Sequence, residues 1–413
     1  MATSALNRRN DEGVALILVL MLVVLLSAIV FEYAYETQVE ASLAANGRGD
    51  MEAYVAAKSA VAVGMGLLLG DQMQDVYGEY AQGGGQTRVT NPASNRNQAN
   101  RQNLQNQQAG FGEYDCKWTD TWGQPIAQQI NNATMHCNIE DECGKLNLNV
   151  FSDFSAEREA MENADMNKQG NPVNPTSSVN PANPNNPNQQ GAPVQARMEA
   201  LETVLRNLFD QMEVEPNPTD AVLDWLDVDD EPRPEGAESD FYESLETPYA
   251  CKNGPMESIE ELLLIAGITP EIYFDLNRDP EETQELRQQE DELYPVSSLP
   301  DLLTACGSIE GKINVNTARP ELLMALFQDP AAVDTILAAQ QQTPFQDVQD
   351  LGTSVSMPKE FNDLLDVKSN VFRIQGDGFV DDVMVRVEAY VVRPDAYSEI
   401  PMPFRILSWR VIR

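Results

Sequence analysis

The residues whose types and spacing could do chemistry form an acidic cluster in the middle of the chain. Residues 224–238 read Asp-Trp-Leu-Asp-Val-Asp-Asp-Glu-Pro-Arg-Pro-Glu-Gly-Ala-Glu, so seven carboxylates lie within fifteen residues. Such carboxylates repel one another unless a cation neutralises them, and Ca²⁺ takes about six to eight oxygen ligands at about 2.3–2.6 Å in irregular loops. The cluster therefore indicates a calcium site, and the ordinary alternative is a solvated acidic loop.

The ligands of this site can be ranked from the sequence. The spacing differs from an EF-hand, because no Gly or Glu falls at the positions that an EF-hand requires. We predict that three residues bind the ion directly: Asp227, Asp229 and Glu238. The weaker candidates are Asp224, Asp230 and Glu235.

No catalytic residues can be assigned. The single histidine, His136, stands beside Cys137 in a strand-like run, and the chain has no Gly-x-Ser-x-Gly motif. Pairs of acids could serve a glycosidase, but the acidic cluster has few aromatic residues that would bind a sugar. A membrane-anchored hydrolase is therefore a weak alternative, and we expect a protein that is not an enzyme.

The five cysteines suit an oxidising compartment. Cys137 and Cys143 are close enough for a small disulfide loop, Cys251 and Cys306 could tie two parts of one domain, and Cys116 could be the odd one. The sequence leaves the pairing open. The absence of any Cys-x-x-Cys motif argues against a zinc site.

The overall charge argues against two kinds of partner. The chain has 413 residues and a net charge of −38 at pH 7. Such a surface repels nucleic acids and anionic lipid headgroups, and it attracts divalent cations.

The N-terminal apolar stretch is long enough to cross a membrane. It runs from Gly13 to Phe31 without a charge, and Glu32 is the first charge after it. At about 1.5 Å rise per residue, 18 residues span about 27 Å, which is close to the apolar thickness of a bilayer. Arg8 and Arg9 precede the stretch and predict a cytoplasmic N-terminus, with the rest of the chain exported.

A Gly directly before an uninterrupted apolar helix resembles the leader of type IV pilins and type II secretion pseudopilins. The resemblance implies that a prepilin peptidase cleaves between Gly13 and Val14 and methylates the new amine of Val14. The alternatives are a plain signal anchor and a secretory signal peptide. For a signal peptide, Ser27 and Ala28 are followed by Ile29, which makes a poor cleavage site.

One departure from the pilin pattern is informative. Most members of this family carry Glu at the fifth mature position, where this chain has Leu18. A carboxylate inside a membrane costs about 2.5–3.5 kcal/mol on insertion scales and needs a partner, which in a pilus is thought to be the amine of the subunit ahead. A first subunit has no neighbour ahead, so Leu18 fits a tip position. The simpler explanation is that Leu is the least costly residue there.

Apolar periodicity predicts the elements around these residues. A long N-terminal helix continues to about Tyr77, with flexible glycines at Gly47 and Gly49. We expect strands at 114–118, 134–139, 145–150, 371–374, 383–392 and 404–412, and helices around 198–208, 259–265 and 322–327. We expect the Asn/Pro/Gln tract at 163–193 to be a disordered insertion, because it is too polar and too rich in proline to pack.

A β region split by a helical block predicts an α+β fold. In this fold a pilin-like long N-terminal helix packs on an antiparallel sheet that carries a large inserted all-α domain. The predicted parts are a leader (1–13), a transmembrane segment (14–31), an amphipathic continuation of the helix (32–80), a first β part (81–150), a polar insertion (151–194), an inserted α-domain (195–366) and a second β part (367–413).

The sequence Gly144-Lys-Leu-Asn-Leu-Asn149 recurs as Gly311-Lys-Ile-Asn-Val-Asn316. The second copy leads into a stretch that resembles the helix-hairpin-helix, or SAM-like, modules of DNA-binding proteins. A DNA-binding hairpin needs glycines and nearby basic residues. Here the hairpin reads Gln328-Asp329-Pro330. We therefore expect a structural module and no nucleic-acid partner.

The exported region resembles one family of minor pseudopilins, protein K of type II secretion. The matching motifs are Asp224-Trp-Leu-Asp227-x-Asp229, Gly236-Ala-Glu238, Asn253-Gly254-Pro255, Glu260-Glu-Leu262, Gly267-Ile-Thr269 and Asn314-Val-Asn-Thr-Ala318. The resemblance implies a pilin-like core, an inserted α-domain, bound Ca²⁺ and a place at the tip of a periplasmic fibre, whose assembly the protein helps to initiate.

The same resemblance implies a set of partners. They are two other minor pseudopilins, the major pseudopilin, the inner-membrane assembly platform, the prepilin peptidase and, as an open case, the secreted cargo or the outer-membrane channel. The location implied is the inner membrane of a Gram-negative bacterium, with a single span and a periplasmic C-terminal region. A minor type IV pilin of a surface fibre is the closest alternative.

Overall fold

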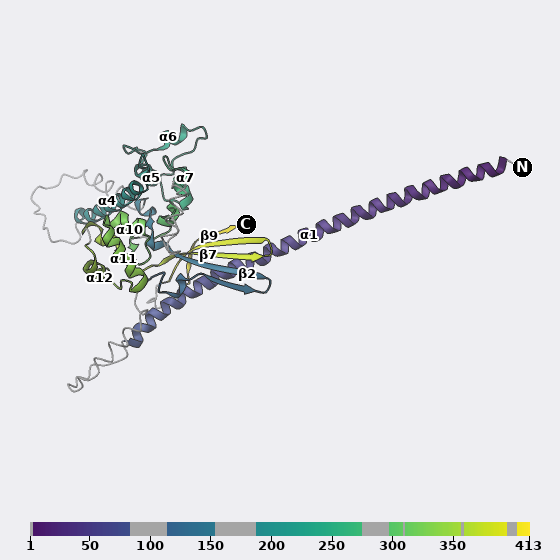
Figure 1. The fold of residues 1–413 in the computed structure, drawn as a ribbon. Coiled ribbons are helices and arrows are strands. Elements are labelled where there is room, and N and C mark those ends of the chain that lie inside the picture. The colour runs from purple at the N-terminus through teal and green to yellow at the C-terminus, as the bar shows by residue number, and fades with distance from the viewer. Residues whose placement is uncertain are drawn as a thin grey trace, which may run out of the picture.

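The computed structural model describes residues 3–82, 114–152, 187–274, 297–308, 310–356, 359–394 and 403–413. Figure 1 shows three parts: a long helix, a sheet that packs along part of it, and a mixed helical domain at one end of the sheet. The core of the helix-and-sheet part and the core of the inserted domain are separate clusters of buried side chains.

The long helix, α1, spans Thr3–Gln82 without interruption, so Gly47 and Gly49 do not break it. Within α1 the segment Leu16–Met73 contains an 18-residue window of mean hydropathy 2.8 that is not buried in this fold, and a helix of this length and composition could cross a membrane. Further along, a face of small residues is buried against the sheet: Ala53, Ala56, Ala57 and Ala60. One helix therefore has two apolar parts, of which only the second packs on this chain.

The sheet has five strands in the order β1-β2-β7-β8-β9, and all its pairings are antiparallel. The strands are β1 (Ile126–Ile130), β2 (Ala133–Asp141), β7 (Val371–Val380), β8 (Val383–Val392) and β9 (Arg405–Ile412). On β8, Val385, Val387 and Ala389 are buried under α1, and the residues between them are more exposed. This alternation is the one that the sequence predicted, because only one face of the sheet is covered by the helix.

Two expected strands of the first β part are wrong, and one was missed. Residues 114–120 form turns and irregular backbone, and the run 145–150 contributes only β3 (Leu146–Asn147). β3 is not in the large sheet but pairs in parallel with β4 (Leu303–Thr304) in the inserted domain. The strand that was missed is β1, which pairs with β2. Its sequence, Ile-Ala-Gln-Gln-Ile, has only a weak strand pattern.

The inserted domain therefore begins soon after β2, earlier than predicted, and it is not all-α. Besides β3 and β4 it contains a second parallel pair, β5 (Ile313–Asn314) with β6 (Leu365–Asp366). Its helices are α4 (Pro187–Gln211), α5 (Thr219–Leu226), α6 (Ser239–Glu243), α7 (Pro270–Tyr273), α9 (Leu299–Leu302), α10 (Pro320–Phe327), α11 (Pro330–Gln342) and α12 (Val348–Ser354). Among the described residues of the whole chain, short 3₁₀ helices also occur at η1 (Thr121–Gly123), η2 (Glu142–Gly144), η3 (Ile259–Leu264) and η4 (Lys359–Leu364).

The C-terminal end of the polar insertion is helical, although the sequence predicted disorder there. Residues 187–194 belong to α4, which begins at Pro187. The rest of the Asn/Pro/Gln tract, residues 163–186, lies outside the described residues, as do residues 83–113 of the expected first β part.

The two copies of the repeated motif have the same local structure. Asn147 accepts a hydrogen bond from the backbone N–H of Asn149 at 3.1 Å, and Asn314 accepts one from that of Asn316 at 2.9 Å. Asn149 then bonds both the N–H and the C=O of Met256, as Asn316 does with Phe345. Each motif thus fixes a distant backbone segment, which explains the recurrence by structure alone.

In the hairpin between α10 and α11, the side chain of Asp329 caps the N-terminus of α11. Gln328 has a left-handed φ of 51°, and the carboxylate of Asp329 accepts a hydrogen bond from the N–H of Ala331 at 3.0 Å. The N-terminus of α11 therefore already carries a negative charge where a DNA-binding hairpin would hold a phosphate.

All five cysteines are free thiols in this structure, so neither suggested disulfide is formed. The thiol of Cys143 lies 3.4 Å from the side chain of Asn370, and that of Cys251 lies 3.8 Å from the carbonyl oxygen of Asp224. Cys137 lies under α1, close to Gly64. Each thiol therefore packs against a different part of the fold.

Candidate metal site in the inserted domain

The acidic loop, residues 227–238, is held between two helices. The helix before it, α5, begins after Asn217, whose side chain accepts a hydrogen bond from the N–H of Thr219 at 3.0 Å. Every residue of α5 is buried, and the helix ends at Asp227. At the other end of the loop Glu238 directly precedes α6. The helix ends thus fix the first and last acids of the loop.

The structure brings together the three carboxylates that the sequence favoured. One carboxylate oxygen from each of Asp227, Asp229 and Glu238 lies within 4.8 Å of the others. These residues are eleven positions apart along the chain at most, and the loop folds back to join them. Such a spacing of oxygens is what a single hard cation would bridge.

Glu238 is the unusual member of this cluster. It is only 3% exposed, and both of its carboxylate oxygens are buried without a hydrogen-bond partner. Burial, together with the nearby carboxylates of Asp224 and Asp227, raises the pKa of Glu238 to about 8. A buried carboxylate normally has a partner, so Glu238 fits a site that a cation completes.

Asp224, one of the weaker candidates, lies in α5 and has a different role. Asp224 is fully buried and accepts a hydrogen bond from the N–H of Arg233 at 3.1 Å, and the guanidinium of Arg233 lies 3.3 Å away. Burial raises the pKa of Asp224 to about 6. Gly236 is needed here, because a Cβ on it would lie 1.9 Å from a carboxylate oxygen of Asp224.

Asp230 and Glu235 lie at the edge of the cluster. Asp230 accepts a hydrogen bond from the N–H of Ser239 at 3.3 Å, and hydrogen bonds from Ser239 lower the pKa of Asp230. Glu235 is exposed, and its backbone N–H donates to the carboxylate of Asp220 at 3.2 Å. Neither joins the group of three oxygens.

The structure adds one residue that the ranking missed. Asn253 donates from its side chain to the carbonyl oxygen of Asp229 at 2.8 Å, and its own side-chain oxygen is buried without a partner. Amide oxygens are ligands that Ca²⁺ accepts, so Asn253 could contribute a neutral one. The signal was present in the sequence as the motif Asn253-Gly254-Pro255, one of the motifs that resemble protein K.

A cluster of aromatic rings packs next to the acidic loop. Trp225 packs edge-on against Tyr242 with ring centroids 5.2 Å apart, and Tyr249 packs on Tyr242 at 5.3 Å. The hydroxyl of Tyr242 accepts a hydrogen bond from the N–H of Ala266 at 3.2 Å. The acids thus stand on a rigid apolar base, and their oxygens suit a hard cation in number and type.

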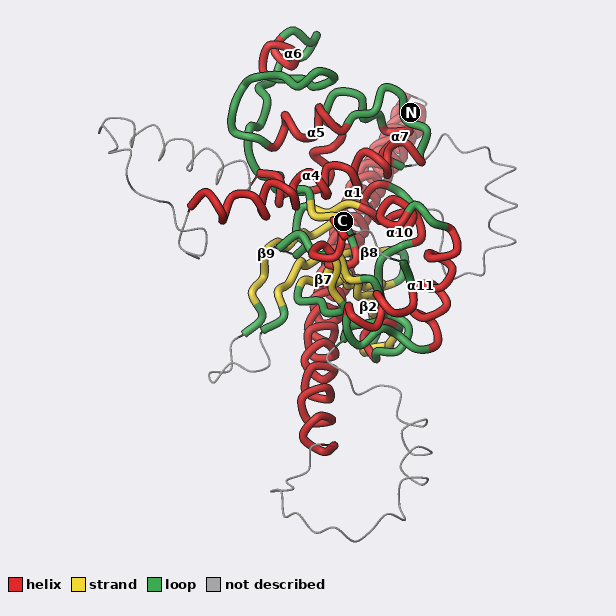
Figure 2. The backbone as a smooth tube through the Cα atoms, turned by 90° about the vertical axis from the view of Figure 1, so that its left-hand side faces the viewer, coloured by secondary structure: helices red, strands yellow, loops and turns green. Residues whose placement is uncertain are grey.

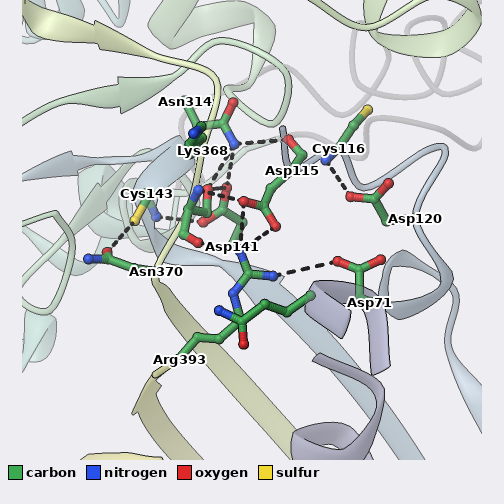
Figure 3. Close-up of polar contacts among 12 residues, drawn as sticks. Asp71, Asp115, Cys116, Asp120, Asp141, Cys143, Asn314, Lys368, Asn370 and Arg393 are labelled. Carbon is green, nitrogen blue, oxygen red and sulfur yellow. Dashed lines mark hydrogen bonds and ion pairs between the residues drawn. The ribbon is translucent and has the colours of Figure 1, made fainter. Parts of the chain in front are cut away.

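A second acidic group lies at the junction of the long helix, the sheet and the inserted domain (Figure 3). Carboxylate oxygens of Asp71, Asp115 and Asp120 lie within 4.8 Å of one another. Arg393 contacts Asp115 at 2.7 Å and Asp71 at 3.5 Å. Because the guanidinium of Arg393 already neutralises part of this negative charge, we interpret the group as a structural ion-pair cluster.

Hydrogen bonds connect this junction to the inserted domain. Asp141, at the end of β2, accepts hydrogen bonds from the hydroxyls of Thr317 and Ser369, each at 2.5 Å. The side chain of Asn314 donates to the carbonyl oxygen of Asp115 at 3.0 Å. Burial raises the pKa of Asp141 to about 6. The junction therefore links α1, the sheet and the second repeated motif.

Comparison with known proteins gives a consistent family match. Residues 144–278 and 313–368 each match a family model described as type II secretion system, protein K. Protein K of Aeromonas hydrophila is 28% identical over 203 residues, which cover 46% of this chain and 54% of that protein. Protein K of Dickeya chrysanthemi is 30% identical over 174 residues, or 41% of each chain. The chain spans about half the length of these curated relatives, or less.

Among solved structures, the crystal structure of a GspK–GspI–GspJ complex from the type 2 secretion system of enterotoxigenic Escherichia coli aligns with a TM-score of 0.45 and 17% identity. The alignment covers 71% of this chain and 85% of that one. The family resemblance predicted from the sequence motifs is confirmed by the family models and the curated relatives.

Proposed function

We propose that this chain, a member of the type II secretion protein K family, is a minor pseudopilin at the tip of the pseudopilus, a structural subunit without enzymatic activity. In this proposal α1 anchors the protein in the inner membrane, with the N-terminus in the cytoplasm and the sheet and inserted domain in the periplasm. The subunit begins and caps a short fibre that serves protein export across the outer membrane.

The observation that carries the proposal is the position of the inserted domain. It lies at the end of the sheet remote from the N-terminus (Figure 1). Pilin-like subunits pack with their long helices side by side, so a domain of this bulk would meet the body of any subunit ahead. Leu18 supports the same position, because a subunit without a neighbour ahead needs no acid there.

The partners follow from the same proposal. The solved complex of a protein K contains GspI and GspJ, and we propose that the corresponding two minor pseudopilins bind this chain. The major pseudopilin would follow below them, and the assembly platform and the prepilin peptidase would act on α1 in the membrane. The secreted cargo, or the outer-membrane channel, would meet the exposed inserted domain.

The tip position can be tested by electron microscopy of pseudopili that contain the full chain with a gold-binding tag after Arg413. We expect label at one end of each fibre and nowhere along its length. The major pseudopilin with the same tag is the control, and it should be labelled throughout. Label from the tagged chain at regular intervals along the fibre would contradict the proposal.

We further propose that the acidic loop binds Ca²⁺. Asp227, Asp229 and Glu238 would supply the carboxylates, and Asn253 would supply an amide oxygen. The ion would neutralise the mutual repulsion of these acids and so hold the loop in one conformation. The support is the group of three oxygens together with the unpartnered, buried carboxylate of Glu238.

Calorimetry of the full chain in detergent tests this site. Calcium that binds only the folded state stabilises it by RT ln(1 + [L]/Kd), about 2.7 kcal/mol at a hundred times the Kd. We expect a higher melting temperature in calcium than in excess chelator, and no difference for Asp227→Ala combined with Glu238→Ala.

A matched control for the double variant is Asp334→Ala combined with Asp363→Ala. Both residues are exposed acids outside the loop, so the net charge changes by the same amount. The control should keep the full response to calcium. Equal melting temperatures of the unaltered chain in millimolar calcium and in chelator would mean that the loop is only a solvated acidic loop.

A further inference from the structure

The outer strand β9 leaves one edge of the sheet open. Among the described residues β9 pairs only with β8, and Figure 2 shows it at the margin of the sheet. Four large apolar side chains of β9 are 41–48% exposed: Ile406, Leu407, Val411 and Ile412. An eight-residue strand in this position presents a row of backbone N–H and C=O groups to the solvent.

Such an edge is normally protected. Natural sheets protect their edges with charged side chains (especially lysine), prolines, β-bulges or very short strands. β9 contains no Lys and no Pro, and it is longer than the other outer strand, β1, which has five residues. The one irregularity is at Leu407, which stands out of register between the pairs Tyr390–Ser408 and Val391–Ile406. Apart from this bulge and two arginines, the edge is long and apolar, and these are the features of a pairing surface.

The charge of this edge is opposite to that of the protein. Residues 405–413 read Arg-Ile-Leu-Ser-Trp-Arg-Val-Ile-Arg, with three arginines and no acid, in a chain of net charge −38. Arg410 pairs with Glu260 at 2.5 Å, and Arg413 lies 3.6 Å from Asp50. Within the described part of the chain Arg405 has no ion pair. A partner segment that matches this edge is therefore acidic.

We propose that β9 is a docking edge for an extended acidic segment of another protein chain, which adds to the sheet as an outer strand beyond β9. The main-chain groups of β9 would supply hydrogen bonds, its exposed apolar side chains would supply contacts, and Arg405 would select negative charge. The outer strand β1 is short and uncharged, which is why the proposal concerns β9 alone.

The probe is an eight-residue peptide in which Glu alternates with Val, labelled for fluorescence anisotropy and added to the full chain in detergent. We expect this peptide to bind and a Lys–Val peptide of the same length to bind at least tenfold more weakly. Methylation of alternate backbone nitrogens of the acidic peptide should abolish binding, because it removes the donors that a strand needs.

Variants of the protein test the charge. Arg405→Glu should weaken the binding of the acidic peptide about three- to tenfold, as expected for the reversal of an exposed charge pair. Lys58→Glu is the control, because Lys58 is exposed on α1 and its reversal changes the net charge equally. Hydrogen exchange should show new protection confined to residues 405–412.

Three results would each overturn the proposal. They are the absence of binding by the acidic peptide, equal binding by its backbone-methylated form, and protection that falls on β1 or the inserted domain instead of β9. None of these results depends on the tip position or on calcium, so this proposal and the proposed function can fail separately.

Discussion

Two glycines of β7, Gly376 and Gly378, let α1 pack closely on the strand, and Gly378 gives the sharpest test of this contact. A Cβ on Gly378 would lie 1.9 Å from the carbonyl oxygen of Ala53 and 2.8 Å from the backbone nitrogen of Ala57. Ordinary contacts begin near 3.4 Å, so Gly378→Ala forces the helix and the strand apart by more than an ångström. Both contacts are backbone atoms, which cannot rotate away as a side chain could.

Two opposing effects set the size of the change. Overpacking of this kind destabilises the folded state by about 1–3 kcal/mol. Alanine also lowers the conformational entropy of the unfolded chain, which offsets about 0.4–1 kcal/mol of that loss. We therefore expect Gly378→Ala to lower the free energy of unfolding by about 1–2 kcal/mol. The small residues of α1 that pack there, Ala53 and Ala57, would lose part of their burial.

Urea unfolding of the full chain in detergent measures this change. The matched control is Gly66→Ala, because a Cβ on Gly66 meets nothing within 4 Å and the residue lies inside α1. Alanine is favoured over glycine in a helix by about 0.5–1 kcal/mol, so the control should stabilise the protein. The reasoning would be refuted by a Gly378→Ala protein as stable as the unaltered chain, or by two variants that shift in the same direction.

The remaining predictions concern processing, assembly and pH. Gly13→Glu should leave an uncleaved precursor, and N-terminal sequencing of the mature protein should find Val14 first; a start far downstream would indicate a secretory signal peptide. Leu18→Glu should give no gain in a secretion assay, because a tip subunit has no amine ahead to pair with the new acid; efficient incorporation within the fibre would contradict the tip position. Burial raises the pKa of Asp141 from 3.8 to about 6, so its contribution to stability is full below about pH 3.8 and is lost as the pH rises through about 6. Asp141→Asn should therefore cost more stability at pH 4 than at pH 7 in urea unfolding, and an equal cost at both would count against this assignment.

The parts of the fold that could be predicted are those with a strong local pattern. The strand at 383–392 was predicted with its correct bounds, because alternate residues face α1 and the solvent. The run at 145–150 misled the prediction, because its apolar residues are buried in the inserted domain and its strand partner, β4, is more than 150 positions away. A short apolar run does not tell which surface buries it.

The candidate metal site was largely readable from the sequence. Asp227, Asp229 and Glu238 lie in one short loop, so their closeness in the chain predicted their closeness in space. Asn253 was missed, because nothing in the local pattern says that a residue after α6 returns to Asp229. The junction cluster was not predictable either, since Asp71 and Arg393 are more than 300 positions apart.

The sequence by itself predicted the apolar N-terminal helix, the acidic loop and the resemblance to protein K, because each of these is a local or composition-based property. Only the tertiary structure decided which edge of the sheet stays open, which carboxylate is buried without a partner, and how the inserted domain is tied to the sheet. The reason is physical: exposure, burial and ion pairing are set by contacts between segments far apart in the chain, such as Arg393 with Asp115 and Gly378 with Ala53.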